Sequence, residues 1–284
     1  DFRPLLAPRS PGGHKGTYGH VLVCGGSRGK TGAIAMTGYA ALRAGAGLVT
    51  VAVPRSAQAQ VAAFAPERMT APLPETDHGC LSEEAAARLL ELSSGKSVSA
   101  LCPSIGTSAP TRAAVQQSLK GTDLPVVLDA DGLNAIAPLR TGSAGGGLRI
   151  LTPHPGEMSR LTGIPVAQIV SERLEISRRF SIEQGIHLIL KGERTLLTDP
   201  GGQVWVNPTG SPAMATGGTG DILTGMIAGL LAQFPDRPDL AARLAVWLHG
   251  KAGELGAAGL GEQSLIATDL LRYLPDSFHA ARTA

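Results

Sequence analysis

The sequence lacks most features that mark extracellular, membrane or nucleic-acid-binding proteins. Its three cysteines, Cys24, Cys80 and Cys102, are odd in number and have no metal-type spacing, which argues against a disulfide framework or a zinc site. No apolar run approaches the ~18 to 20 residues of a membrane span, and the first residues lack the apolar core of a signal peptide. The net charge of +2, without a basic run, gives no reason to expect nucleic acid or a membrane as partner. These absences favour a cytoplasmic protein with reduced thiols.

Aromatic residues are also scarce, at 4%, whereas glycine is abundant, with 37 residues. Hydrophobic residues (43%) outnumber charged residues (17%), which is the balance of a globular chain and excludes disorder. Strand and helix patterns alternate along the chain, and no internal repeat or linker divides it. We therefore expect one domain over residues 1–284, a doubly wound three-layer α/β/α fold around a mostly parallel sheet.

Hydrophobic periodicity predicts the order of the elements. Strands are predicted at 20–24, 48–53, 98–102, 125–129, 149–152 and 187–190, with a hairpin over 196–206. Helices are predicted up to about 44, at 82–92, 110–119 and 171–184, after the glycines near 218, at 240–255 and after 267. The segment around Pro72 and Pro74 is expected to be a connector, and residues 141–147 a surface loop.

The most distinctive stretch runs from residue 207 to 231. Two prolines and four glycines within fourteen residues exclude a regular helix or central strand from its first half. The second half repeats apolar residues at helical spacing, and Gly225 and Gly229 would let another backbone approach closely. Gly217-Gly-Thr-Gly-Asp221 joins the two halves. It should place unblocked backbone N–H groups at the positive end of a helix, which predicts an anion site.

Asp221 stands in the first turn of this predicted helix. The helix dipole would stabilise its carboxylate as the anion, which predicts an ordinary, low pKa. One interpretation is a plain N-terminal cap. The glycines favour a functional site instead, because a cap does not need three glycines before it.

A second glycine-rich loop, 25–32, lies between a predicted strand and a helix, which is a nucleotide-binding layout. A P-loop needs four residues between its first glycine and the Gly-Lys-Thr sequence, and Gly25 leaves three before Gly29. A P-loop nucleotide hydrolase is therefore only a minor alternative.

Polar residues follow three other predicted strands. Asp129 and Asp131, two apart in an extended chain, can face one crevice at a strand's carboxyl end, where they suit hydrated magnesium beside phosphates. The alternative is a turn in which the acids act as turn formers. His154 follows the next strand between two prolines, and Lys191-Gly192 follows another. His249, on a later helix, is expected to be a satisfied core or surface histidine.

Taken in order, these motifs resemble the NAD(P)H-hydrate dehydratases, which are ribokinase-like repair enzymes. The resemblance covers nearly the whole chain through residues 14–19, 25–27, 129–134, 151–157, 191–192 and 216–221. One departure is Cys102-Pro-Ser-Ile-Gly106, where the family usually has Gly-Pro-Gly-Leu-Gly. Two side chains therefore stand where backbone would approach the substrate.

The resemblance implies a reaction in which NADH or NADPH hydrated at ring carbon six returns to the normal cofactor at the expense of ATP or ADP, with Mg²⁺. Asp221 would be the general base that allows phosphorylation of the hydroxyl, after which phosphate is expelled. The anion hole would comprise Gly217, Gly218, Thr219 and Gly220. The implied nucleotide-binding residues are Lys191, Gly192, Glu193, Arg194, Thr195 and Gly220; the implied contacts to NADH-hydrate or NADPH-hydrate are Ala33, Gly106, His154 and Asp221; and Asp129 and Asn134 would lie near Mg²⁺ through water.

Family analogy also implies a homotetramer and favours ADP as the nucleotide. A small-molecule kinase of the same superfamily, acting on a vitamin-precursor alcohol, is the first alternative. It would use the same base and anion hole but would stop at the phosphorylated alcohol. The Thr-Pro-His-Pro-Gly-Glu run at 152–157 favours the dehydratase. A non-catalytic nucleotide-binding module is the second alternative, and Asp221 argues against it.

Overall fold

The computed structural model describes residues 1–101, 103–140 and 145–283. Its strands are β1 (His20–Cys24), β2 (Leu48–Pro54), β3 (Met69–Leu73), β4 (Val98–Leu101), β5 (Val126–Leu128), β6 (Arg149–Leu151), β7 (His187–Leu190), β8 (Leu196–Thr198) and β9 (Val204–Val206). They form a 9-stranded sheet in the order β3-β2-β1-β4-β5-β6-β7-β8-β9. The pairs from β3 to β7 are parallel, and β8 and β9 are antiparallel. The mostly parallel sheet and the hairpin are thus confirmed.

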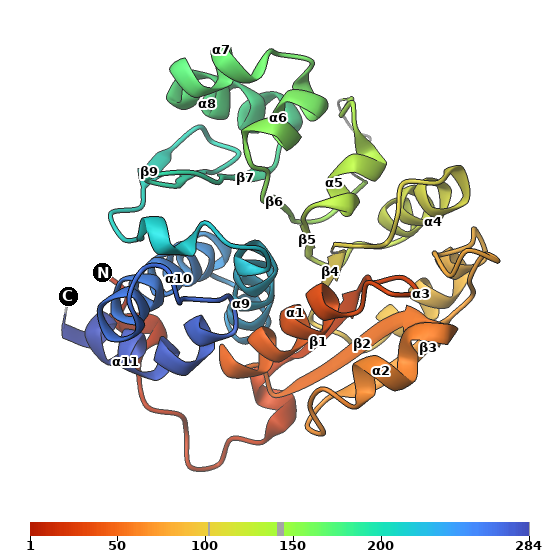
Figure 1. Ribbon diagram of the computed structural model, residues 1–284, viewed down its shortest axis with the longest axis horizontal. Helices are drawn as coiled ribbons and strands as arrows, with labels where there is room; N and C mark the ends of the chain where they lie inside the picture. Colours follow the sequence, from red (N-terminus) through yellow and green to blue (C-terminus); the bar gives the residue numbers. More distant parts are fainter. Residues whose placement is uncertain (102, 141–144, 284) are drawn as a thin grey trace.

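Helices cover both faces of this sheet (Figure 1). One layer contains α1 (Gly32–Arg43), α2 (Gln58–Ala62), α9 (Thr219–Gln233), α10 (Pro238–Leu260) and α11 (Asp269–Thr283). The other contains α3 (Ala85–Ser93), α4 (Ala109–Lys120), α5 (Asp131–Ile136), α6 (Pro155–Thr162), α7 (Val166–Ser171) and α8 (Arg173–Gln184). Alternate residues of the strands feed the two cores: Val21 and Val23 of β1 join the first, Leu22 and Cys24 the second. This is the predicted three-layer architecture.

Two elements differ from the sequence prediction. The prediction of a connector around Pro72 was wrong, because residues 69–73 form β3, paired with β2. β3 is an edge strand, where a proline leaves no inward hydrogen bond unmade. Residues 131–136, expected to be extended or a turn, form the short helix α5.

None of the helices in the described part of the chain has the length and hydropathy that a membrane crossing requires.

Helix α9 is buried along most of its length and packs backbone-to-backbone on α1. A Cβ atom added at Gly225 would overlap the carbonyl oxygen of Thr37, and one at Gly229 would lie 2.5 Å from the carbonyl oxygen of Ala41. The close approach predicted from these two glycines is confirmed. It holds the start of α9 in one position relative to the sheet.

The chain changes direction across the sheet at β1. From β1 it goes to β2 and β3 on one side, and it then returns to β4 on the other side. In such sheets a crevice opens outside the carboxyl ends of the strands at this point. The loops after β1 and β4 touch there, since the N–H of Gly26 donates to the carbonyl of Pro103 at 3.0 Å.

We expect Gly225→Ala to lower the free energy of unfolding by about 1–3 kcal/mol, because the new methyl group forces α9 away from α1. Gly32→Ala is the control, since a Cβ on this helical glycine meets nothing within 4 Å. Denaturant unfolding followed by circular dichroism would measure both. Equal stabilities for the two variants would contradict the proposed backbone contact.

Candidate active site

Charged side chains gather where β5, β6 and β7 end. Lys191 directly follows β7, and its Nζ lies 2.6 Å from Oδ1 of Asp129, which directly follows β5. Nζ also lies 3.7 Å from Oε2 of Glu157, in the first turn of α6. Asp129 is only 2% exposed and Glu157 only 5%. The cluster is therefore an interior ion-pair network at the carboxyl edge of the sheet.

The start of α9 faces this network. Gly218 is the N-cap residue with φ 99, and Thr219, Gly220 and Asp221 begin the helix. A Cβ on Gly220 would lie 3.4 Å from Nζ of Lys191 and 3.7 Å from Oδ2 of Asp129. Asp221 is the third helical residue, so its interpretation as the N-cap was wrong. In this described segment no side chain caps the first turn, which leaves backbone N–H groups for a ligand.

Thr224 completes the surroundings of Asp129. Its Oγ1 donates to Oδ2 of Asp129 at 3.0 Å, while Lys191 donates to Oδ1. Thr224 lies three residues after Asp221 on α9, a spacing that places both on one side of a helix. That spacing was present in the sequence, but we had not predicted a role for Thr224.

The environment of Asp221 sets its acidity. The pKa of Asp221 is raised to about 7: burial is the largest cause, the negative charges of Asp129 and Glu157 add to it, and Lys191 opposes them. The low pKa expected from the helix dipole was wrong, because burial and like charges outweigh the dipole. For Lys191, burial disfavours the cation, but the neighbouring carboxylates outweigh burial and raise its pKa. The site thus pairs a firmly charged lysine with a carboxyl that titrates near neutral pH.

His154 caps α6. Its Nδ1 accepts hydrogen bonds from the N–H groups of Gly156 at 3.0 Å and Glu157 at 3.3 Å, and Oε2 of Glu157 accepts the N–H of His154 at 2.8 Å. Burial lowers the pKa of His154. Its side chain is still 51% exposed, so the ring that caps the helix also presents a face to solvent. Glu157 had no assigned role from the sequence, although its spacing from His154 is that of a capping box.

The turn after β7 is exposed beside Lys191. Gly192 and Arg194 have φ values of 149 and 52, and the hydroxyl of Thr195 donates to the carbonyl of Gly192 at 3.2 Å. Arg173 of α8 stabilises this turn by donating a hydrogen bond to the carbonyl of Glu193 at 2.7 Å. Arg173 lies 20 residues before Glu193 in the sequence, and no sequence pattern pointed to it.

The loop after β4 also lies at the carboxyl edge of the sheet. Gly106 has φ 88, and its N–H donates to Oδ2 of Asp131 at 3.1 Å. Ser104 has φ 63, the left-handed conformation that favours glycine. The backbone therefore keeps a glycine-type shape at 104 although a serine stands there. Cys102, the other departure from the family pattern, lies outside the described residues.

Ala33 lies at the start of α1, beside the start of α9. Three residues further along α1, the Cε of Met36 would be 2.7 Å from a Cβ placed on Gly218. The first turns of α1 and α9 thus border the same space, on the side of α9 that packs on α1.

The predicted acidic pair is divided between two sets of partners. The chain turns at Ala130, where φ is 50, so Asp131 begins α5 and bonds to Gly106, while Asp129 faces Lys191. The expectation that an extended chain would direct Asp129 and Asp131 to one crevice was wrong. Asn134 bonds to Arg160 at 2.7 Å through Oδ1 and to Asp131 through Nδ2.

These contacts limit how magnesium could bind. Both oxygens of Asp129 are hydrogen-bonded, and the described residues contain no group of three or more His, Cys, Asp or Glu able to hold a metal ion. Mg²⁺ keeps several waters and commonly binds phosphates rather than an all-protein cage. The residues present therefore fit a hydrated ion that arrives with a nucleotide and meets Asp129 through water, and Asn134 is engaged elsewhere.

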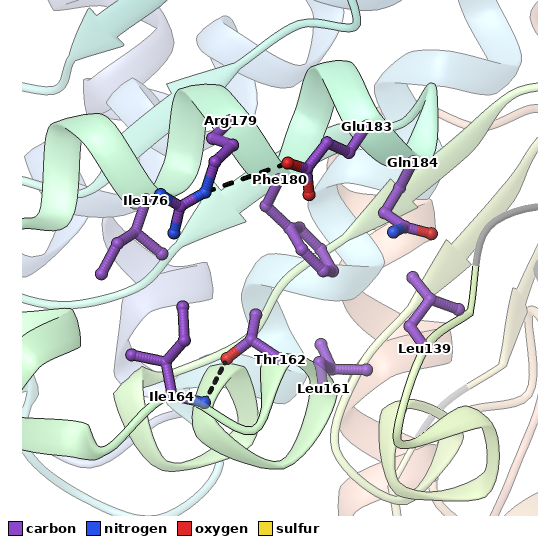
Figure 2. Close-up of a pocket in the computed structure, with 9 residues that line it drawn as sticks. All are labelled: Leu139, Leu161, Thr162, Ile164, Ile176, Arg179, Phe180, Glu183 and Gln184. Carbon is purple, nitrogen blue, oxygen red and sulfur yellow. Dashed lines mark hydrogen bonds and ion pairs between the residues drawn. The ribbon is translucent and has the colours of Figure 1, made fainter.

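A pocket of about 300 Å³ is lined by none of these groups. Figure 2 shows the side chains that line it. Apolar side chains of α6 and α8, including Leu161, Ile176 and Phe180, line it. It reaches the last residues of both helices, Thr162 and Gln184, which places it toward the amino edge of the sheet, because helices between parallel strands run back to that edge. None of the predicted site residues lines it. This pocket is therefore separate from the candidate active site.

Comparison with known proteins places the chain in a family. The family model described as NAD(P)H-hydrate dehydratase matches residues 21–276. The chain belongs to the NAD(P)H-hydrate dehydratase family. It is 47% identical over 274 residues to a bifunctional NAD(P)H-hydrate repair enzyme of Moorella thermoacetica, an alignment that covers 96% of this chain and 52% of that protein. The chain thus spans about half the length of this and similar relatives.

Other members of the family are matched over nearly their full length. An ADP-dependent (S)-NAD(P)H-hydrate dehydratase of Bacillus subtilis is 36% identical over 277 residues, 96% of this chain and 94% of that one. A crystal structure of an ADP/ATP-dependent dehydratase from the same organism, co-crystallised with ATP and Mg²⁺, has a TM-score of 0.85 and 33% identity, covering 99% of this chain and 97% of that one.

The ribokinase-like fold is also confirmed. Ribokinase of Giardia lamblia has a TM-score of 0.55 at 12% identity, covering 91% of this chain and 99% of that one. At this identity the likeness shows the fold alone.

Ser104→Gly should raise the free energy of unfolding by roughly 1 kcal/mol, because it removes the strain of a left-handed serine. Ser94→Gly is the matched control: Ser94 has φ −58, so glycine there only adds freedom to the unfolded chain. Denaturant titration of both variants measures the effect. A loss of stability at position 104 equal to that at 94 would rule the strain out.

Asp221→Asn should change how stability depends on pH. The unfolded aspartate has a pKa of about 3.9, so between that value and about 7 the folded state holds a proton that the unfolded state has lost. The free energy of unfolding of the wild type therefore falls as pH rises through that window. The asparagine side chain of the variant does not titrate, so the variant does not show this fall. The melting temperature of the variant relative to wild type should increase from pH 4 to pH 8. Parallel melting curves across this range would show that Asp221 has no raised pKa.

Proposed function

We propose that this chain dehydrates the 6-hydroxy hydrate of NADH or NADPH at the expense of ADP or ATP. The observation that carries the proposal is the position of Asp221, a carboxyl with a pKa of about 7 in the first turn of α9, beside Lys191 and uncapped backbone N–H groups. A base, a cation and anion-binding amides are the parts that phosphoryl transfer to an alcohol requires. Membership of the dehydratase family supports this reaction.

In the first step the substrate hydroxyl attacks the terminal phosphorus of the nucleotide. Asp221 accepts the hydroxyl proton, the new O–P bond forms, and the bond to the leaving nucleotide breaks. Because its pKa lies near neutral pH, Asp221 is a better base than an ordinary aspartate. The backbone N–H groups of residues 217–220 stabilise the charge on the transferring phosphoryl group.

In the second step phosphate leaves the ring. The electron pair of the ring nitrogen expels it from carbon six, and loss of a proton from the adjacent carbon restores the double bond of the reduced nicotinamide. Phosphorylation matters because hydroxide is a poor leaving group and phosphate a good one. The net change is loss of water from the hydrate and hydrolysis of the nucleotide.

The nucleotide would lie over the turn after β7. Lys191 supplies charge to its phosphates, and the backbone of Gly192, Glu193, Arg194 and Thr195 lines it, with Gly220 opposite. Three carboxylates surround Lys191, so a nucleotide arriving with Mg²⁺ would be repelled less than a bare one. When bound, the ion would neutralise phosphate charge, and Asp129 would hold its waters.

The hydrated nicotinamide nucleotide would contact the facing walls. Ala33 at the start of α1, Gly106 after β4 and the exposed ring of His154 border the carboxyl edge of the sheet. Asp221 stands at the start of α9 on the same edge. These four residues stay our predicted substrate contacts.

Three further expectations belong to this proposal. Residues 1–284 would work as one domain, the protein would assemble as a homotetramer, and it would act in the cytoplasm. The alignment with the Bacillus subtilis dehydratase covers 96% of this chain and 94% of that protein. This supports activity in a chain of this length. The nucleotide would be ADP or ATP, as in the names of the similar proteins.

The deciding experiment incubates the protein with enzymatically hydrated NADH and either ADP or ATP, and follows the return of reduced-nicotinamide absorbance. Return with either nucleotide is expected. A stable phosphorylated product from a vitamin-precursor alcohol, with no return of absorbance, would favour the kinase. Nucleotide binding without any product would favour a non-catalytic module.

Asp221→Asn should leave nucleotide affinity largely intact and lower kcat by at least ~100-fold, because the base is lost while the backbone amides remain. Asp239→Asn is the control, since Asp239 is an acid in the first turn of α10 that bonds to His187. Turnover and calorimetric nucleotide binding would be measured for both. Near-wild-type turnover in Asp221→Asn would overturn its assignment as the base.

A further inference from the structure

Helix α10 packs against residues 207–218, the glycine-rich segment that precedes α9. The hydroxyl of Thr209 donates to the carbonyl of Trp247 at 2.9 Å. A Cβ on Gly250 would overlap Thr209, and one on Gly253 would overlap the sulfur of Met214. One face of α10 is therefore a close support for the segment that leads into the start of α9.

His249 stands on this face and reaches the start of α9 itself. Its Nε2 lies 2.9 Å from the carbonyl oxygen of Thr219. A carbonyl oxygen only accepts, so Nε2 carries the proton. Burial lowers the pKa of His249 to about 4, so the ring is neutral at physiological pH. The expectation of a satisfied histidine is thus confirmed, but its partner is a residue of the predicted anion hole.

The carbonyl of Thr219 and the N–H of Gly220 belong to one planar peptide group. A hydrogen bond that holds the carbonyl therefore also sets the direction of that N–H. Accepting a hydrogen bond polarises the peptide and makes its N–H a stronger donor. The loop needs such a support, because glycines at 217, 218 and 220 leave its backbone intrinsically free to rotate.

The side chain of Thr219 is also hydrogen-bonded. Its hydroxyl lies 3.1 Å from the carbonyls of both Met214 and Thr216. These bonds tie Thr219 to its own loop. The bond from His249 is different, because it ties the loop to a separate helix.

We propose that His249 is a positioning residue, which holds the Thr219–Gly220 peptide so that its N–H points at the transferring phosphoryl group. The proposal rests on the proposed function. His249 touches neither substrate nor nucleotide and moves no proton. Its contribution appears in the transition state, where the anion hole is needed most.

The test compares His249→Phe, which removes the donor but keeps a ring, with His249→Gln, whose amide N–H can take the place of Nε2–H. We expect kcat of the phenylalanine variant to fall roughly 10- to 100-fold, the range below loss of a direct anion-hole donor, with KM for hydrated NADH little changed. The glutamine variant should recover much of this loss. The shape of the pH–rate profile should be the same in all variants, whereas loss of a catalytic acid or base would remove one limb.

His187→Phe is the matched control. His187 is the first residue of β7, at the opposite edge of the sheet, and its Nδ1 lies 2.9 Å from Oδ1 of Asp239 on α10. This variant also removes an imidazole that contacts α10. It should lose some thermal stability but keep the wild-type kcat.

A second readout is independent of activity. Hydrogen exchange of the peptide covering residues 217–222, measured by mass spectrometry, should be faster in His249→Phe than in the wild type and unchanged in His187→Phe. Wild-type protein without dehydratase activity would defeat the proposed function, and the exchange data would still decide whether His249 holds this peptide. Wild-type exchange in His249→Phe, or an equal fall in kcat for both phenylalanine variants, would overturn the positioning role.

Discussion

The close packing of α9 on α1, backbone against backbone, sets where α9 meets the carboxyl edge of the sheet. Gly225 and Gly229 make this approach possible, since a methyl group at either position would meet a carbonyl oxygen of α1. The contact fixes where α9 begins. The start of the helix then stands between the first turns of α1 and the Lys191–Asp129 pair at the ends of β7 and β5.

Electrostatics follow from this placement. Lys191 and Asp129 form a short ion pair, and Thr224 occupies the second oxygen of Asp129. Asp221 lies beside them, largely buried, in a region already rich in carboxylates. Burial, and after it the negative charges of those carboxylates, raise its pKa to about 7. A site with a base whose pKa lies near neutral pH, next to a permanently charged lysine, is suited to accepting a proton and binding a phosphoryl group.

The comparisons and the geometry address different questions. The fold is shared with ribokinase at 12% identity, which says nothing about the substrate. The family is established by the match over residues 21–276, and the site explains which chemistry the fold offers. Ser104 illustrates how a departure from the family pattern is accommodated: the backbone keeps its left-handed turn, and the serine bears the strain.

The sequence by itself determined most of the strands and helices, the point at which α9 begins and the close contact through its glycines, because these depend on periodicity and on backbone freedom at single positions. Tertiary structure decided the rest. The edge strand β3, the turn at Ala130 that separates Asp129 from Asp131, and the roles of Thr224 and His249 depend on partners far away in the chain. The pKa of Asp221 is the clearest case: the helix dipole is a local effect that sequence reveals, whereas burial and the charge of Asp129 come from folding and outweigh it.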